Sequence, residues 1–448
     1  MTWYRFESEM INSDTIFAVS SGSGMAGIAV IRISGVKAGI ILASIAGPLP
    51  LPRLASVRQL RVPGSGEVID QALVLWMPGP SSATGEDVAE FHVHGSTAVI
   101  DTIFGIFGSV IGVRLAEPGE FTRRAFANDR MDLVEAEGLA DLLHARTESQ
   151  RRMAMHHMLG HASSQYEVWR TELVSILARL EAAIDFVEEE GVAAAALADI
   201  RSNTLDLIKR LSRAAAEADR AGALRSGVKV VFAGAPNVGK STLLNLVAAR
   251  EAAIVSSHPG TTRDVIEVSI VLGGVPVILT DTAGLRPESG DEIENIGMQR
   301  AKSEVGAADI VVWVSSVDVR EEIENAALPT LRVLNKSDLP GDVVHQGSHL
   351  RISAKTGEGV ADLIAELEKL VKERFGGMEQ ASVVRTRHKD AVEESIRFLN
   401  DSLSYKADQI ELAAECLRRA CFSIARVTGR VDVEDLLAKI FSEFCVGK

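Results

Sequence analysis

The chain has 448 residues, of which 46% are hydrophobic, and it carries a formal net charge of −14 at pH 7. This length accommodates two to four domains that each bury a core. Because an acidic surface repels a phosphate backbone, nucleic acid would have to be bound through a local basic patch or through a second protein.

Compartment signals are few. The three cysteines are too few for a disulfide framework and indicate a reducing compartment. The first residues lack the basic and then apolar order of a signal peptide, and no apolar run reaches ~18 residues. We therefore expect a cytoplasmic protein without a membrane-spanning segment.

The N-terminal part, residues 1–130, is predicted to form a mixed α/β domain. Short strand-forming runs recur at 28–33, 72–76 and 90–93. Clusters of glycine, proline and serine separate these runs, as expected for strands that are joined by turns.

The remainder is predicted to be a helical domain interrupted by an α/β domain. Residues 131–226 are rich in Ala, Leu, Glu and Arg with apolar residues three and four apart, and residues 378–448 return to this pattern. Residues 227–377 alternate strand, loop and helix. An insertion is the simplest arrangement, because insertions are tolerated where chain ends lie close together on a surface.

A phosphate-binding loop opens the inserted domain. It is Gly-Ala-Pro-Asn-Val-Gly-Lys-Ser at 234–241, between a strand expected at 228–232 and a helix expected at 242–249. This strand–loop–helix context is what the motif requires. Backbone N–H groups and Lys240 would neutralise the phosphates, and Ser241 offers a hydroxyl to Mg²⁺.

Four further motifs follow in the order found in GTPases. They are Thr261-Thr262-Arg263-Asp264, Asp281-Thr282-Ala283-Gly284, Asn335-Lys336-Ser337-Asp338 and Ser353-Ala354-Lys355. The Asp338 carboxylate can accept hydrogen bonds from N1 and N2 of guanine, and it would be left unpaired against adenine. The set therefore predicts GTP binding and hydrolysis, with Asp281 near Mg²⁺ and the Gly284 N–H near the γ-phosphate.

Two features depart from a Ras-like site. Leu285 stands where a water-orienting glutamine is expected, and a leucine cannot polarise water. The acidic residues that follow offer a substitute or form a solvated switch: Glu288, Asp291, Glu292 and Glu294. Asn237, inside the loop, can hold a monovalent cation against the phosphates or simply form the turn.

The segment Cys445-Val446-Gly447-Lys448 lies far from these motifs and is not explained by them. A lysine in its last position argues against a prenylation box. Cys445 is either a reactive residue or a spare surface cysteine, whereas Cys416 and Cys421 have the setting of helix-interior residues.

Residues 13–448 resemble the MnmE (TrmE) family of tRNA modification GTPases. The resemblance rests on the GTPase motifs, the Cys-Val-Gly-Lys segment and a series of short motifs before them. These are Asp14-Thr15-Ile16, Ile31-Arg32-Ile33-Ser34-Gly35, Thr84-Gly85-Glu86-Asp87, His94-Gly95, Pro118-Gly119-Glu120-Phe121-Thr122, Arg124-Ala125-Phe126, Asn128-Asp129, Asp132-Leu133, Glu135-Ala136-Glu137, Asp141-Leu142 and Ala183-Ile184-Asp185-Phe186.

This resemblance implies the fold and the partners. The fold would combine an N-terminal α/β folate-binding domain similar to aminomethyltransferases, which also dimerises, with a helical domain and an inserted Ras-like P-loop GTPase domain. The homodimer would work with the flavoprotein MnmG (GidA) in a heterotetramer or larger complex on tRNA, away from membranes. Together they would add a carboxymethylaminomethyl or aminomethyl group to C5 of the wobble uridine at tRNA position 34, using 5-formyl- or methylene-tetrahydrofolate.

The resemblance also implies roles for single residues. Folate contacts fall on Arg32, Glu86, Arg130 and Lys448, with Arg130 standing where the family has lysine. Glu294 would orient the attacking water and Cys445 would act at the modification site.

In the GTPase domain the resemblance implies two metal ions beside GTP. Mg²⁺ would bind Ser241 and Thr262, and an activating K⁺ would bind Asn237, Ser256, His258 and Thr261. The GTP-binding positions are Asn237, Val238, Gly239, Lys240, Ser241, Thr242, Ser256, Ser257, His258, Pro259, Gly260, Thr261, Thr262, Asp281, Thr282, Ala283, Gly284, Asn335, Lys336, Asp338, Ser353, Ala354 and Lys355.

Two other functions compete with this one. A stand-alone regulatory GTPase of the Era or Der type, acting in ribosome assembly, fits the nucleotide motifs alone. The N-terminal Arg-Ile-Ser-Gly and Thr-Gly-Glu-Asp motifs argue against it. A simple folate-dependent aminomethyltransferase leaves the GTPase motifs unexplained.

Overall fold

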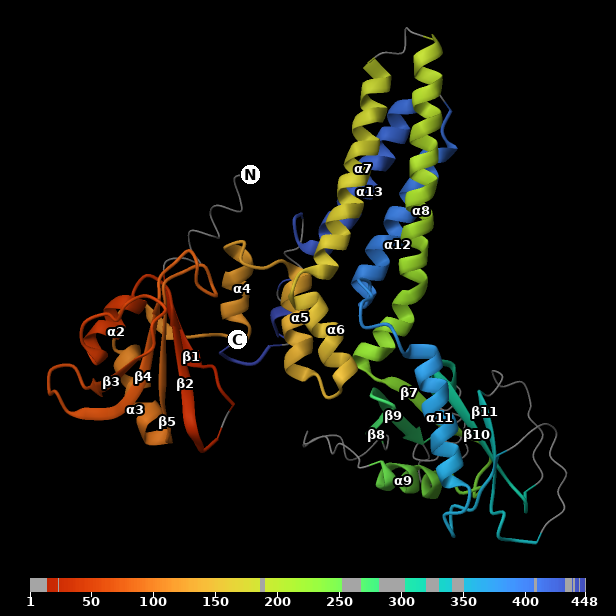
Figure 1. Ribbon diagram of the computed structural model, residues 1–448, viewed down its shortest axis with the longest axis horizontal. Coiled ribbons are helices and arrows are strands. Elements are labelled where there is room, and N and C mark those ends of the chain that lie inside the picture. Colours follow the sequence, from red (N-terminus) through yellow and green to blue (C-terminus); the bar gives the residue numbers. More distant parts are fainter. Residues whose placement is uncertain are drawn as a thin grey trace, which may run out of the picture. The chain divides into compact units, whose positions relative to one another are not determined.

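The chain divides into two compact units, one made of residues 1–140 and 425–448 and the other of residues 141–424. Figure 1 shows that each unit has its own sheet. The computed structural model describes residues 14–22, 24–185, 190–251, 267–281, 303–319, 330–340, 350–406, 409–431, 437, 440–442 and 444–447.

The first unit is built on a six-stranded sheet in the order β3-β4-β5-β2-β1-β6. All neighbouring strands are antiparallel except β1 and β6. The predicted strand-forming runs lie inside β2, β4 and β5, where buried and more exposed residues alternate. The strands are β1 Thr15–Val19, β2 Ala26–Ser34, β3 Ser56–Arg61, β4 Val68–Met77, β5 Val88–Gly95 and β6 Val113–Leu115.

Two helices, α2 (Ala38–Ala46) and α3 (Thr97–Gly108), share one apolar core with this sheet. The Phe107 ring lies in that core, 5.3 Å from the ring of Phe17 and 5.5 Å from that of Phe91. Because side chains alternate along a strand, the residues between the buried ones lie on the opposite face of the sheet. On that face Ile16 and Ala18 form a second, smaller apolar cluster with Phe121, and Arg32 pairs with Glu90.

Helices α4 (Glu120–Ala127) and α5 (Leu133–His144) follow the last strand. The C-terminal residues Phe441 and Phe444 are buried in a cluster with Leu133 and its neighbours. The Phe441 ring lies 6.4 Å from that of Phe126. Residues from both ends of the chain therefore build the first unit.

The second unit holds a sheet in the order β12-β11-β10-β7-β9-β8, parallel except at the β8–β9 edge. Helices α9 (Lys240–Arg250) and α11 (Val360–Phe375) pack on it through one large core. The strands are β7 Val228–Ala233, β8 Glu267–Leu272, β9 Val275–Asp281, β10 Ile310–Ser316, β11 Leu331–Asn335 and β12 Leu350–Arg351. Helix α9 begins two residues before the predicted helix, at Lys240, so its first turn includes the last two residues of the phosphate-binding motif.

Helices form much of the remaining described part of the second unit, as the helical pattern predicted (Figure 1). They are α6 Glu148–Met158, α7 His161–Asp185, α8 Glu190–Ser226, α12 Thr386–Ser404 and α13 Ile410–Thr428, whose last four residues fall in the first unit. The chain passes from α8 into the parallel sheet and returns from α11 to α12. The domain boundaries at 1–130, 131–226, 227–377 and 378–448 stay a prediction. Within the described residues, no helix combines the length and the apolar character that crossing a membrane requires.

Candidate functional site

The phosphate-binding loop connects β7 to α9. Gly234 has a φ of 142° and Gly239 one of 95°, and a Cβ at Gly234 would lie 2.1 Å from the carbonyl oxygen of Val314. Glycine is therefore required there. The Lys240 ammonium donates to the carbonyl oxygens of Gly234 and Ala235, at 2.9 and 2.7 Å. It thus lies at the loop, beside the N-terminus of α9, where phosphate groups are stabilised.

Asn335 connects the loop to the two guanine motifs. It is 2% exposed. Its Nδ2 donates to the Val238 carbonyl at 2.8 Å, and its Oδ1 accepts from the Ala354 N–H at 2.9 Å. A Cβ at Gly239 would lie 2.4 Å from this Nδ2. The Asn335 amide therefore fixes the separation of three motifs that are far apart in the sequence.

Asp338 is held as an ionised carboxylate, the form that can accept hydrogen bonds from guanine. Its Oδ1 accepts a hydrogen bond from the buried Ser353 hydroxyl at 2.6 Å. This bond lowers the pKa of the Asp338 carboxyl, so the carboxylate is an acceptor at neutral pH. Lys336 has a φ of 61°, and its ammonium lies 2.8 Å from the Asp318 carboxylate.

Oxygen atoms suited to Mg²⁺ meet at the start of α9. The Ser241 hydroxyl donates to Asp281 Oδ2, and Asp281 is 1% exposed at the end of β9. Mg²⁺ prefers oxygen ligands of this kind. Thr242 follows in α9, and Asn237 is exposed on the loop with a φ of 61°.

Several predicted site residues lie outside the described part of the chain, and their roles stay predictions. They are Ser256, Ser257, His258, Pro259, Gly260, Thr261, Thr262, Thr282, Ala283, Gly284, Glu294 and Lys448.

The described residues predicted to bind folate lie in the first unit, around α4. The Arg32 guanidinium pairs with Glu90 at 2.8 Å and lies 5.8 Å from the centre of the Phe121 ring. Arg130 is exposed just after α4, and its Cγ lies 3.3 Å from where a Cβ at Gly85 would be.

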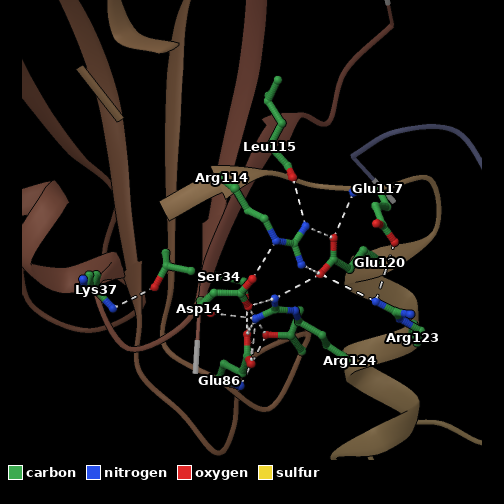
Figure 2. Close-up of polar contacts among 12 residues, drawn as sticks. Asp14, Ser34, Lys37, Glu86, Arg114, Leu115, Glu117, Glu120, Arg123 and Arg124 are labelled. Atoms are coloured by element: carbon green, nitrogen blue, oxygen red, sulfur yellow. Dashed lines mark hydrogen bonds and ion pairs between the residues drawn. The ribbon is translucent and has the colours of Figure 1, made fainter. Parts of the chain in front are cut away.

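Glu86 belongs to a buried network of charges, shown in Figure 2. Arg124 is fully buried; its Nη1 donates to both carboxylate oxygens of Glu86 at 3.1 and 3.2 Å, and its Nη2 donates to Asp14 at 2.7 Å and to Glu120 at 3.0 Å. The Ser34 hydroxyl donates to Glu86 at 2.6 Å. The protein itself thus occupies the Glu86 carboxylate, a role that the sequence did not reveal.

Glu120 is the second carboxylate at the centre of this network, and it is 1% exposed. It accepts from the Arg114 guanidinium at 2.6 and 2.8 Å and from the Glu117 N–H at 2.9 Å. Burial acts to raise the pKa of the Glu120 carboxyl, but the bonds from Arg114, Glu117 and Arg124 outweigh it and lower the pKa to about 2. Glu120 is therefore ionised throughout the neutral range.

The Cys445 thiol is exposed. The backbone beside it is attached to the first unit at two places. Val446 forms an antiparallel bridge with Pro118, and the Gly447 carbonyl accepts from the Ser20 hydroxyl at 2.9 Å.

A phosphate-binding loop between a parallel strand and a helix, joined through Asn335 to an ionised Asp338, defines a P-loop protein built for a guanine nucleotide. Comparison with known proteins gives the family. A family model of the MnmE helical domain matches residues 133–445, and one of the GTP-binding protein TrmE N-terminus matches residues 15–130.

Curated relatives match along nearly the whole chain. A tRNA modification GTPase MnmE from Methylobacterium sp. is 47% identical over 97% of this chain and 100% of the relative. Those from Rhodopseudomonas palustris and Maricaulis maris are each 45% identical, over 98% and 97% of this chain and 99% of each relative. The chain therefore belongs to the MnmE family, and it is a GTPase.

One solved structure, the G domain of the T. maritima FeoB iron transporter, matches at 24% identity over 32% of this chain and 98% of that chain. Its TM-score is 0.25, which is too low to bear on the fold.

Proposed function

We propose that this chain is the GTP-hydrolysing partner in a two-protein enzyme that adds a carboxymethylaminomethyl or aminomethyl group to C5 of the wobble uridine of certain tRNAs. The flavoprotein MnmG (GidA) is the other partner, in a heterotetramer or larger complex. The observation that carries the proposal is one chain that holds both a guanine-nucleotide site and an exposed, anchored Cys445. A stand-alone GTPase of the Era or Der type has no use for the second feature.

The one-carbon unit would come from 5-formyl- or methylene-tetrahydrofolate bound to the first unit. Arg32 supports this, since a guanidinium beside the Phe121 ring suits a planar ligand with carboxylates. Arg130 and Lys448 are the further proposed contacts. Glu86 would act mainly by shaping the site, because its oxygens already accept from Arg124 and Ser34.

Arg32→Met should weaken folate binding about tenfold or more, because it removes the charge and keeps most of the length of the side chain. GTP turnover should stay unchanged. Calorimetry with folate measures the first and phosphate release the second. Arg61→Met is the matched control, since Arg61 is an exposed arginine on the edge strand β3. Glu86→Ala is a poorer test, because it also leaves the buried Arg124 short of a partner. The wild-type chain failing to bind folate would refute the assignment.

In the GTPase site we place Mg²⁺ at Ser241 and Thr262, and K⁺ at Asn237, Ser256, His258 and Thr261. K⁺ supplies positive charge beside the phosphates when it is bound, and Glu294 would orient the attacking water. The exposure of Asn237 on the phosphate-binding loop supports its share of this role.

Hydrolysis should be faster in KCl than in NaCl at equal ionic strength, and Asn237→Gly should remove most of that difference. A positive charge placed as an arginine finger is worth about 10³–10⁵ in rate, and K⁺ would supply part of it. Glycine is the right replacement because Asn237 has a φ of 61°, which alanine tolerates poorly. Equal turnover of the wild-type chain in both salts would rule out the K⁺ site.

We further propose a homodimer formed through the first unit, which light scattering of the purified chain tests. A tRNA substrate places the complex in the cytoplasm.

Hydrolysis and modification should be lost separately. Glu294→Ala should keep GTP affinity and lower kcat by about 10²–10⁴, as expected when a positioned base is lost. Cys445→Ser should keep GTP turnover and abolish or reduce wobble-uridine modification, measured by mass analysis of tRNA with the flavoprotein present.

Cys416→Ser is the control for the thiol and should affect neither assay. Omitting the flavoprotein should abolish modification by the wild-type chain. Normal modification by Cys445→Ser would mean that Cys445 takes no part in the chemistry.

A further inference from the structure

The Pro-Gly-Glu motif forms a tight turn between β6 and α4. The Glu120 N–H donates to the Glu117 carbonyl at 3.2 Å. Gly119 has a φ of 69° and a ψ of 6°, the conformation of the third residue of a type II turn. Proline is favoured at the second position of such a turn and glycine at the third, which matches Pro118 and Gly119. Local backbone geometry thus accounts for the proline and the glycine, but not for the glutamate.

The Glu120 side chain fastens this turn to the rest of the unit. One carboxylate oxygen accepts from the Glu117 N–H at 2.9 Å and from Arg114 at 2.8 Å. The other accepts from Arg114 at 2.6 Å and from Arg124 at 3.0 Å. Charge-assisted hydrogen bonds to two arginines hold the carboxylate in one place. The carboxylate in turn holds the first residue of the turn.

The turn contacts the C-terminal segment, by which we mean the described residues from Phe441 to Gly447. Pro118 forms an antiparallel bridge with Val446. A Cβ at Gly119 would lie 2.3 Å from the carbonyl oxygen of Phe441, so the backbones of the turn and of the segment touch without a side chain between them. A shift of the turn would displace both contacts.

The end of strand β1 and Ser20, which follows it, contact the same segment at Gly447. A Cβ at Gly447 would lie 2.1 Å from the Val19 carbonyl oxygen, and the Ser20 hydroxyl donates to the Gly447 carbonyl at 2.9 Å. Phe444, which precedes Cys445, is 4% exposed. Cys445 is thus exposed between Phe444, which is buried, and Val446, which bridges to Pro118.

We propose that Glu120 is a positioning residue for Cys445: its carboxylate fixes the Pro118–Gly119 turn that seats the C-terminal segment. The chemical role of Cys445 rests on the proposed function, whereas its placement by Glu120 does not. If Glu120 only stabilised the fold, the buried residues Phe441 and Phe444 would hold the segment in its absence. If Glu120 positions Cys445, loss of the turn should make the thiol mobile while the unit stays folded.

A nitroxide attached to Cys445 tests the placement in the full chain. Burial raises the thiol pKa of Cys416, and that of Cys421 to about 11, so at neutral pH the reagent should label Cys445 first. Gly119→Ala should make the label more mobile. Gly66→Ala is the control: Gly66 has a φ of 73°, in the same unit, but a Cβ there meets nothing within 4 Å. The electron paramagnetic resonance spectrum of the nitroxide reports its mobility, and equal spectra for the two variants would overturn the proposal.

Glu120→Gln tests the carboxylate itself. Where the variant folds, the nitroxide on Cys445 should become more mobile. The kcat for tRNA modification should fall by about 10²-fold, the cost of a misplaced reacting group, and GTP turnover should stay unchanged. Glu117→Gln, at an exposed side chain, should do neither. Should Glu120→Gln fail to fold, Glu120→Asp replaces it: the charge stays, but the shorter side chain should lose its bond to the Glu117 N–H, and the label on Cys445 should become more mobile.

The outcomes separate the two proposals. A freed label with normal modification would contradict the role of Cys445 and leave its placement intact. An unchanged label in folded Glu120→Gln would contradict the placement.

Discussion

A guanidinium that water cannot reach must have its charge balanced by the protein, and Arg124 is such a group. Burying an ion costs several kcal/mol, and removing one partner of a buried pair costs about 3–5 kcal/mol. Three carboxylates balance Arg124: Asp14 before β1, Glu86 before β5 and Glu120 in α4. This requirement fixes α4 against the sheet and holds the loop that carries Glu86. Through Glu120 it also fixes the turn that contacts the C-terminal segment.

The nucleotide site also contains a buried polar group that must find partners inside the protein, the neutral side-chain amide of Asn335. The Asn335 amide donates to one motif and accepts from another, and burying it unpaired would cost about 1–3 kcal/mol. The loop, the guanine-binding carboxylate and the Ser353 segment are therefore arranged by the chain itself. In this chain, buried ion pairs hold the first unit together, whereas hydrogen bonds from buried amide and hydroxyl groups hold the nucleotide site together.

Local patterns predicted much of this structure and none of its long-range pairs. Short strand-forming runs between clusters of glycine, proline and serine indicated β2, β4 and β5, and the phosphate-binding motif with its flanking residues predicted strand, loop and helix in order. Helix α9 begins earlier than expected because Gly239 is already its N-cap. The bonds from Arg124 to Asp14 and from Ser20 to Gly447 join residues 110 and 427 positions apart, and no periodicity reports such pairs. The resemblance predicted Glu86 as a folate contact, which stays a prediction, and nothing in the sequence around Glu86 indicated its bonds to Arg124.

The coupling between Arg124 and Glu120 tests the central claim most directly. Native-state hydrogen exchange of the α4 amides in the full chain gives the free energy of local opening. Arg124→Met and Glu120→Met should each lower it by about 3–5 kcal/mol. The double variant should lose at least about 1 kcal/mol less than the two losses added together, because neither charge is then left without the other. Losses that simply add would show that the two side chains act independently and would contradict the account.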